Sequence, residues 1–134
     1  MQQLTAEDVI AEFRLLPHPF DGWYARVDTS VAHPVRYHYL IRSGEYAAWH
    51  RTGGRLVMTH IDGAPLTLTL SDGGRATRSH VLHESREHSC MVEDTEWRTW
   101  ESLGHWSLMI VSAEKKSHFL NWSLAPDNWH PQPG

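Results

Sequence analysis

The stretch from residue 44 to residue 63 reads GEYAAWHRTGGRLVMTHIDG and decides how the rest of the chain is interpreted. Residues 56–61 are rich in apolar and β-branched side chains, which is typical of a strand. Gly53-Gly54 precedes this segment and Asp62-Gly63 follows it, and both dipeptides are turn signals. The stretch therefore predicts short strands that are joined by tight turns.

The same pattern continues on both sides of this stretch. Residues 35–41, 66–70 and 105–111 also read as strands, and residues 66–70 alternate strictly between Leu and Thr. Ser43-Gly44 and Asp72-Gly73-Gly74 supply further turns. Many short strands at this spacing predict an all-β fold, either a sandwich or a barrel.

The two ends of the chain differ from this β region. Thr5 and Asp8 resemble a helix capping box, and Val9, Ile10 and Phe13 follow with helical spacing, so we expect a helix over residues 5–16. The barrel is expected over residues 22–124, and a Pro-rich surface tail over residues 125–134. No repeat or linker divides the 134 residues, which predicts a single domain over residues 1–134.

Composition excludes several classes of protein. The formal net charge is −4 and no run of Lys or Arg occurs, which argues against nucleic-acid binding. Cys90 is the only cysteine, so an internal disulfide is impossible and a reducing compartment is expected. The sequence begins without a signal-peptide pattern and has no apolar run that could span a bilayer. These features predict a cytoplasmic protein that does not bind membranes.

The spacing of Gly44, His50, Thr52, Leu56 and Gly63 resembles the first motif of the cupin superfamily, a Gly-His-His-Glu-Gly pattern. Further segments are similar to the cupin-5 family, also called DUF985, and occur in that family's order: 18–24, 37–41, 49–51, 63–66 and 118–122. The resemblance implies a cupin jelly-roll β-barrel with a short N-terminal helix. It also implies a homodimer, and a jelly roll of this size has edge strands that need cover.

Cupins usually hold a metal with several imidazoles and a carboxylate, and the resemblance places those ligands at positions 50, 52, 56 and 98. This chain keeps only His50, because Thr52, Leu56 and Arg98 stand at the other positions. A leucine cannot coordinate, and a permanently cationic guanidinium repels a divalent ion. The sequence therefore predicts neither a metal nor another cofactor. His80, His83 and His88 lie close in sequence, but we expect them on the surface.

Alternation along the strands predicts which side chains share the barrel interior. The resemblance adds Trp97, which stands where the family has a Trp. The predicted substrate-binding residues are Arg98, Thr52, His60, Met58, Trp97, Trp100 and Leu56. An interior Arg98 needs a partner, either an internal carboxylate such as Glu101 or Glu45, or a bound carboxylate, phosphate or enolate.

The predicted catalytic residues are His50, Tyr37 and Tyr39. An imidazole titrates near neutral pH, so His50 is a candidate general acid or base; the alternative is a hydrogen-bonded core residue left from a metal site. Tyr37 or Tyr39 could supply a phenol, and the alternative is packing. The solvated character of Arg36, His38 and Arg42 would turn both tyrosines inward.

Two functional hypotheses follow from these residues. The first is a metal-independent enzyme that binds a small, partly apolar, anionic or carbonyl-bearing molecule and performs isomerisation, epimerisation, elimination or cyclisation. The second is a non-catalytic protein that binds a small molecule in the same interior. The departures from the family pattern suggest a specialised role, such as one in secondary metabolism.

Overall fold

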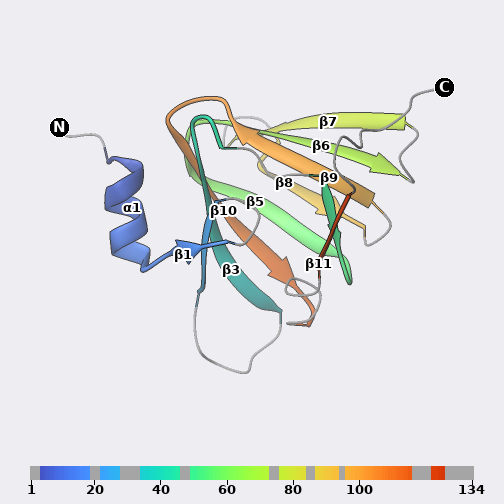
Figure 1. Cartoon of the computed structure of the whole chain (residues 1–134), viewed down its shortest axis with the longest axis horizontal. Helices are drawn as coiled ribbons and strands as arrows, with labels where there is room; N and C mark the ends of the chain where they lie inside the picture. The colour runs from blue at the N-terminus through green and yellow to red at the C-terminus, as the bar shows by residue number, and fades with distance from the viewer. Residues whose placement is uncertain are drawn as a thin grey trace.

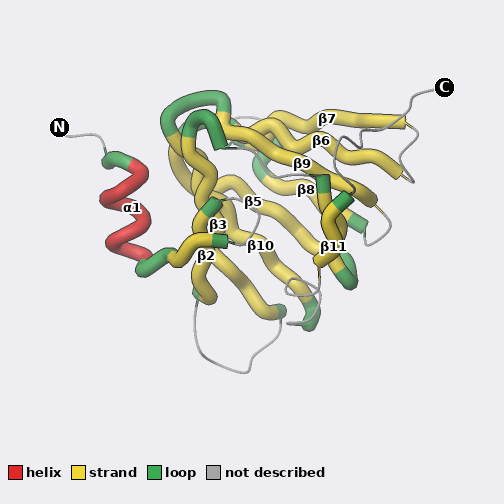
Figure 2. The backbone as a smooth tube through the Cα atoms, viewed as in Figure 1, coloured by secondary structure: helices red, strands yellow, loops and turns green. Residues whose placement is uncertain are grey.

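The computed structural model describes residues 4–18, 22–27, 34–45, 49–72, 76–83, 87–93, 96–115 and 122–125. Within these ranges it contains one helix, α1 (Ala6–Phe13), and antiparallel strands that form two sheets (Figures 1 and 2). The strands are β1 (Leu16–Pro17), β2 (Trp23–Arg26), β3 (Val35–Arg42), β4 (His50–Thr52), β5 (Leu56–Gly63), β6 (Leu66–Asp72), β7 (Ala76–Leu82), β8 (Ser89–Val92), β9 (Glu96–Ser102), β10 (Trp106–Ala113) and β11 (Trp122–Leu124).

The two sheets are stacked as in a jelly roll, which confirms the predicted fold class. The six-stranded sheet has the order β1-β2-β3-β10-β5-β8, and the five-stranded sheet has the order β11-β4-β9-β6-β7. Alternate residues of each strand point between the sheets, where leucines of β6 meet Met58 of β5 and Met109 of β10 in one core cluster. The interior of the fold is therefore enclosed by the inner faces of both sheets.

Strand β3 places the two candidate tyrosines in this interior. Val35, Tyr37, Tyr39 and Ile41 all belong to the core cluster, whereas Arg36 between them is exposed. The alternation of polar and apolar residues in this segment therefore predicted its inner face correctly.

Helix α1 covers part of the outer face of the six-stranded sheet. Thr5 and Asp8 form the expected capping box, and Val9 packs with Leu40 and Leu108 of that face. The helix ends at Phe13, earlier than the expected residue 16, because Arg14 adopts a left-handed conformation with φ of 55°. Its N–H then bonds back to the carbonyls of Ile10 and Ala11, and the chain continues into β1.

Two expectations from the sequence concern segments outside the described residues. One is the turn at Gly73-Gly74, and the other is the Pro-rich tail beyond Ala125. In the ranges that are described, no helix is long and apolar enough to cross a membrane.

Candidate functional site

Pairing between β4 and β9 brings the central motif residues together. His50 of β4 lies directly opposite Arg98 of β9 in the antiparallel register. Because opposite residues in such a pair point to the same side, the imidazole and the guanidinium share the inner face of the sheet. Thr52 follows two residues after His50 and points the same way, so its hydroxyl reaches Arg98.

Arg98 is the most unusual residue of the interior, because its side chain is charged and its exposure is 0%. Its Nη2 donates a hydrogen bond of 2.8 Å to the hydroxyl of Thr52. That hydroxyl donates in turn to the carbonyl of Gly54 at 3.1 Å, which fixes it as the acceptor for Arg98. The Nε and Nη1 atoms of Arg98 are buried and have no partner among the described residues. Burial lowers the pKa of Arg98 to about 10, so the group stays charged at neutral pH.

Among the described residues, the carboxylates that could neutralise Arg98 are engaged elsewhere or exposed. Glu96 is buried and accepts two hydrogen bonds from Nη2 of Arg78, at 2.9 and 3.1 Å. Its charge raises the pKa of Arg98, but by less than burial lowers it. Glu45 is bound to Arg42 on the opposite sheet, and Glu101 is exposed. Neither of the internal partners expected from the sequence therefore neutralises Arg98.

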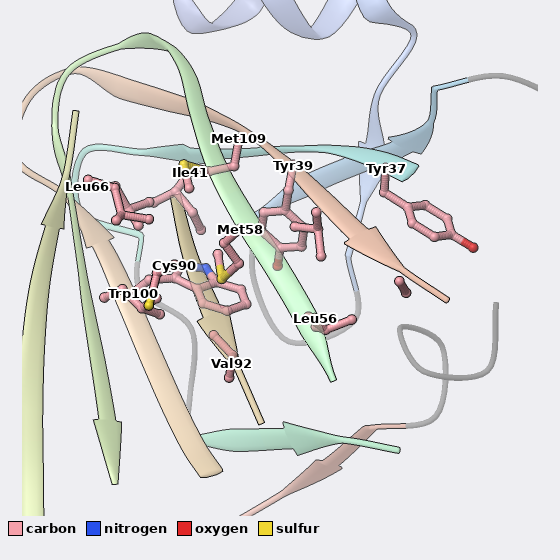
Figure 3. Close-up of a cluster of buried hydrophobic side chains, with 14 of the residues drawn as sticks. Tyr37, Tyr39, Ile41, Leu56, Met58, Leu66, Cys90, Val92, Trp100 and Met109 are labelled. Atoms are coloured by element: carbon pink, nitrogen blue, oxygen red, sulfur yellow. The ribbon is translucent and has the colours of Figure 1, made fainter. Parts of the chain in front are cut away.

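Aromatic rings form a wall beside this polar group. The ring of Trp100 meets His50 edge-on at a centroid distance of 4.7 Å and meets Tyr39 edge-on at 5.3 Å. Figure 3 shows Tyr39 turned toward Met58 and Trp100, whereas Tyr37 points away from them. The indole Nε1 of Trp100 is buried and has no partner within the described part of the chain. Tyr39, rather than Tyr37, therefore lies with His50 and Trp100. Burial raises the pKa of the Tyr37 phenol.

The other predicted residues divide between the core and the outer face. Leu56 and Met58 lie in the core cluster between the sheets. Trp97 does not line the interior, because it alternates with Arg98 and so points to the opposite face of β9. There the guanidinium of Arg51 lies over its ring at 4.7 Å. The expectation that Trp97 contacts a ligand inside the barrel is therefore not supported by its position.

Two histidines have a more specific environment than the sequence indicated. His60 is buried on the inner face of β5, and its Nε2 lies 2.8 Å from the carbonyl of Ala64. His80 was expected on the surface, but it lies opposite Leu68 and so faces the interior from β7. Its Nδ1 lies 2.7 Å from a carboxylate oxygen of Glu87. Arg78, His80 and Leu82 alternate along β7 and so lie on one face of the strand. Only the pairing of β7 with β6 shows that this face is the inner one.

The residues at the four cupin ligand positions do not fit a divalent metal. His50 is the only imidazole among them, Leu56 has no donor atom, and Arg98 is a buried cation. In the described segments, no group of three His, Cys, Asp or Glu residues could hold a metal ion. The groups at these positions that can act on a ligand are therefore the imidazole of His50, the hydroxyl of Thr52 and the guanidinium of Arg98.

Comparison with known proteins agrees with the fold. Residues 7–114 match the family described as cupin superfamily (DUF985). A protein structure from Shewanella oneidensis is 18% identical, with a TM-score of 0.76, and the match covers 92% of this chain and 85% of that one. A hypothetical protein from Leishmania major is 15% identical, with a TM-score of 0.78 and coverage of 94% and 90%.

More distant structures of this fold include an enzyme. An oxalate oxidase in complex with the substrate analogue glycolate is 14% identical, with a TM-score of 0.63 and coverage of 81% of this chain and 57% of that one. No curated protein matches the sequence. The family match spans most of the 134 residues, so the chain belongs to the DUF985 family of the cupin superfamily.

Proposed function

We propose that this cupin binds a small anionic or carbonyl-bearing molecule against Arg98 and transfers a proton with His50, without a metal. The observation that carries the proposal is the fully buried guanidinium whose Nε and Nη1 lack partners among the described residues. Buried polar groups in native proteins nearly always have hydrogen-bond partners. The two unpaired nitrogens of Arg98 therefore need an acceptor that the described residues do not supply.

A carboxylate or a developing oxyanion would supply an acceptor for one of the free donors of Arg98, Nε or Nη1. Hydrogen bonds between charged groups typically contribute about 1.5–3 kcal/mol each, and more precise positioning follows from their short, directed geometry. The Arg78–Glu96 pair is neutral as a whole, so the local charge left for a ligand is that of Arg98. An oxalate oxidase of the same fold is described with glycolate bound, which shows that another protein with this fold holds a small carboxylate.

His50 is placed to move a proton on such a ligand. It faces Arg98 across the β4–β9 pair and meets Trp100 edge-on, which limits how its ring can turn. The imidazole would take a proton from a carbon next to the held carbonyl, and the C–H electron pair would form an enolate whose oxyanion Arg98 stabilises. Return of the proton to another carbon isomerises the molecule, and return to the other face of the same carbon epimerises it. Tyr39 is the nearer phenol for a complementary proton.

Metal independence is part of the proposal and has its own test. Protein stripped with a chelator should keep its fold, its ligand binding and its activity. Stoichiometric iron, manganese, nickel or zinc that is lost together with activity would contradict this part of the proposal.

Deuterium exchange separates an enzyme from a binding protein. Wild-type protein, His50→Ala and Arg98→Leu are incubated in D₂O with a panel of small 2-oxo acids and 3-hydroxy acids, and loss of the C–H signals is followed by proton NMR. An enzyme should exchange at least one C–H, and His50→Ala should slow that exchange by roughly 10²–10⁴-fold while binding is nearly unchanged. Arg98→Leu should weaken binding instead. Binding that depends on Arg98 without any exchange would establish the non-catalytic alternative, and equal behaviour of all three proteins would refute both.

A further inference from the structure

A hydrogen bond to a backbone carbonyl fixes which ring nitrogen of His60 carries the hydrogen. The other ring nitrogen has no hydrogen-bond partner among the described residues. A carbonyl oxygen can only accept, so the Nε2 that lies 2.8 Å from the Ala64 carbonyl must carry a hydrogen. In the neutral imidazole, Nδ1 then bears a lone pair. This Nδ1 atom is buried and has no partner among the residues that the structure describes.

His80 has the same arrangement with the two nitrogens exchanged. Glu87 accepts from Nδ1 at 2.7 Å, so in the neutral ring the lone pair is on Nε2. Nε2 is buried and likewise has no partner in the described segments. A carboxylate or carbonyl that orients an imidazole in this way leaves its other nitrogen ready to meet a ligand.

Three described residues between β7 and β8, namely His83, Glu87 and His88, contact His60 or His80, which we together call the histidine subsite. The backbone N–H of His60 donates to the carbonyl of His88 at 2.7 Å, and the His60 ring lies 5.3 Å from the ring of His83. The N–H of His83 donates to the carbonyl of Glu87 at 2.9 Å, and Glu87 holds His80. The histidine subsite, His60 and His80, is therefore tied together through one short segment of the chain.

The register of the five-stranded sheet relates this subsite to Arg98. His80 lies opposite Leu68, which lies opposite Trp100 on its other side, so β6 separates the two aromatic residues. Two strand spacings and two residues along β9 put the backbones of His80 and Arg98 about 12 Å apart. His80 and Arg98 lie on the same inner face of the five-stranded sheet, where Leu68 and Leu70 of β6 are paired with them.

We infer that the histidine subsite accepts a hydrogen bond from a hydroxyl group, whose one hydrogen goes to a free nitrogen of either His60 or His80, so that the ligand is a small hydroxylated carboxylate. The inference rests on the proposed function in one respect: the carboxylate end of the ligand binds to the free donors of Arg98. At the other end the free atoms are acceptors, and a second carboxylate there would meet lone pairs instead of donors. A hydroxyl supplies the matching hydrogen. The set of described His, Cys, Asp and Glu residues offers no third ligand that would make this a metal site.

A series of straight-chain carboxylates from butanoate to octanoate, with and without a terminal hydroxyl, tests the inference. Binding is followed by the ring resonances of His60 and His80 in ¹⁵N-labelled protein, which also report which nitrogen of each ring carries the hydrogen. We expect Nε2–H in His60 and Nδ1–H in His80. At the chain length that spans the interior, the hydroxyl should tighten binding roughly three- to tenfold.

Matched variants assign that gain to the subsite. His80→Phe and His60→Phe keep a ring of similar size but remove the acceptor. Because a hydroxyl carries one hydrogen, one of the two variants should abolish the gain from the hydroxyl, and both should leave binding of the plain carboxylates nearly unchanged. His60→Phe is expected to fold, because Ser107 also donates to the Ala64 carbonyl, at 2.6 Å. His105→Phe changes an exposed imidazole elsewhere and should have no effect.

The outcomes separate this inference from the proposed function. Plain carboxylates that bind through Arg98 with no gain from a hydroxyl at any length would overturn the inference alone. Donor hydrogens on Nδ1 of His60 or Nε2 of His80 would also overturn it. If no carboxylate binds, the proposed function fails. The straight-chain alkanols then decide the inference: it stands if they shift the ring resonances of His60 or His80 and is overturned if they shift neither.

Discussion

Replacement of Arg98 by methionine should make the ligand-free protein more stable, because Arg98 is buried with two free donors. Burial lowers the pKa of Arg98 to about 10 from a usual value of 12.5. This corresponds to about 3 kcal/mol of unfavourable free energy for the buried charged form. Methionine is a long, flexible apolar side chain that suits such a site.

The substitution also removes a favourable contact. The hydrogen bond from Arg98 to Thr52 is lost, which costs about 1–2 kcal/mol, although the Thr52 hydroxyl keeps its bond to Gly54. The net expectation for Arg98→Met is therefore a gain of about 1–2 kcal/mol in the free energy of unfolding. Selection for a binding site would explain why such a residue is retained at a cost in stability.

Urea denaturation followed by tryptophan fluorescence measures this change, in a buffer free of small carboxylates and phosphate. Arg51→Met is the matched control, because Arg51 is exposed and lies over the ring of Trp97. It should lose about 0.5–1 kcal/mol, which is the opposite sign. If Arg98→Met instead lost more than about 1 kcal/mol, Arg98 would be a structural residue with an internal partner, and the reasoning would be refuted.

Three further predictions concern the rest of the fold. Burial lowers the pKa of His18 to about 4, so the unfolded chain takes up the proton first and stability should fall as the pH falls from 6.5 to 4. His18→Phe should flatten this part of a pH series of urea curves, and an unchanged slope would contradict it. Gly63→Ala should lower the midpoint of thermal unfolding more than Gly44→Ala, since both have positive φ but only at Gly63 would a Cβ meet the Trp106 carbonyl, at 2.5 Å; equal effects would count against it. The protein should form a two-fold dimer through the outer face of the six-stranded sheet, where Met91 is 50% exposed, so Met91→Lys should weaken it; light scattering from a monomer at micromolar concentrations would exclude it.

Local patterns in the sequence predicted the parts of this molecule that depend on one strand or one motif. The alternation in β3 correctly predicted that Tyr39 points inward, and the family resemblance placed His50 and Arg98 at positions that the structure shows to be directly paired. The end of the helix was wrong, because Arg14 takes the left-handed conformation that usually marks a glycine.

Features that depend on how one strand pairs with another, or on contacts between side chains, were missed. His80 faces the interior only because β7 pairs with β6, and Glu87 reaches it only because the chain returns toward β8. The placement of Trp97 among the binding residues followed the family resemblance rather than the alternation with Arg98, and the structure shows that the alternation was the better guide. The engagement of Glu96 by Arg78, which leaves Arg98 unneutralised, also required the three-dimensional contacts.

The most direct test of the central claim is a crystal structure of the protein grown with a mixture of small carboxylates and hydroxycarboxylates. The account predicts an acceptor oxygen that does not belong to the protein, about 2.7–2.9 Å from Nε or Nη1 of Arg98, with His50 beside the bound molecule. A protein carboxylate or carbonyl that bonds both of these nitrogens would contradict it, because Arg98 would then be an ordinary internal ion pair and not a binding group.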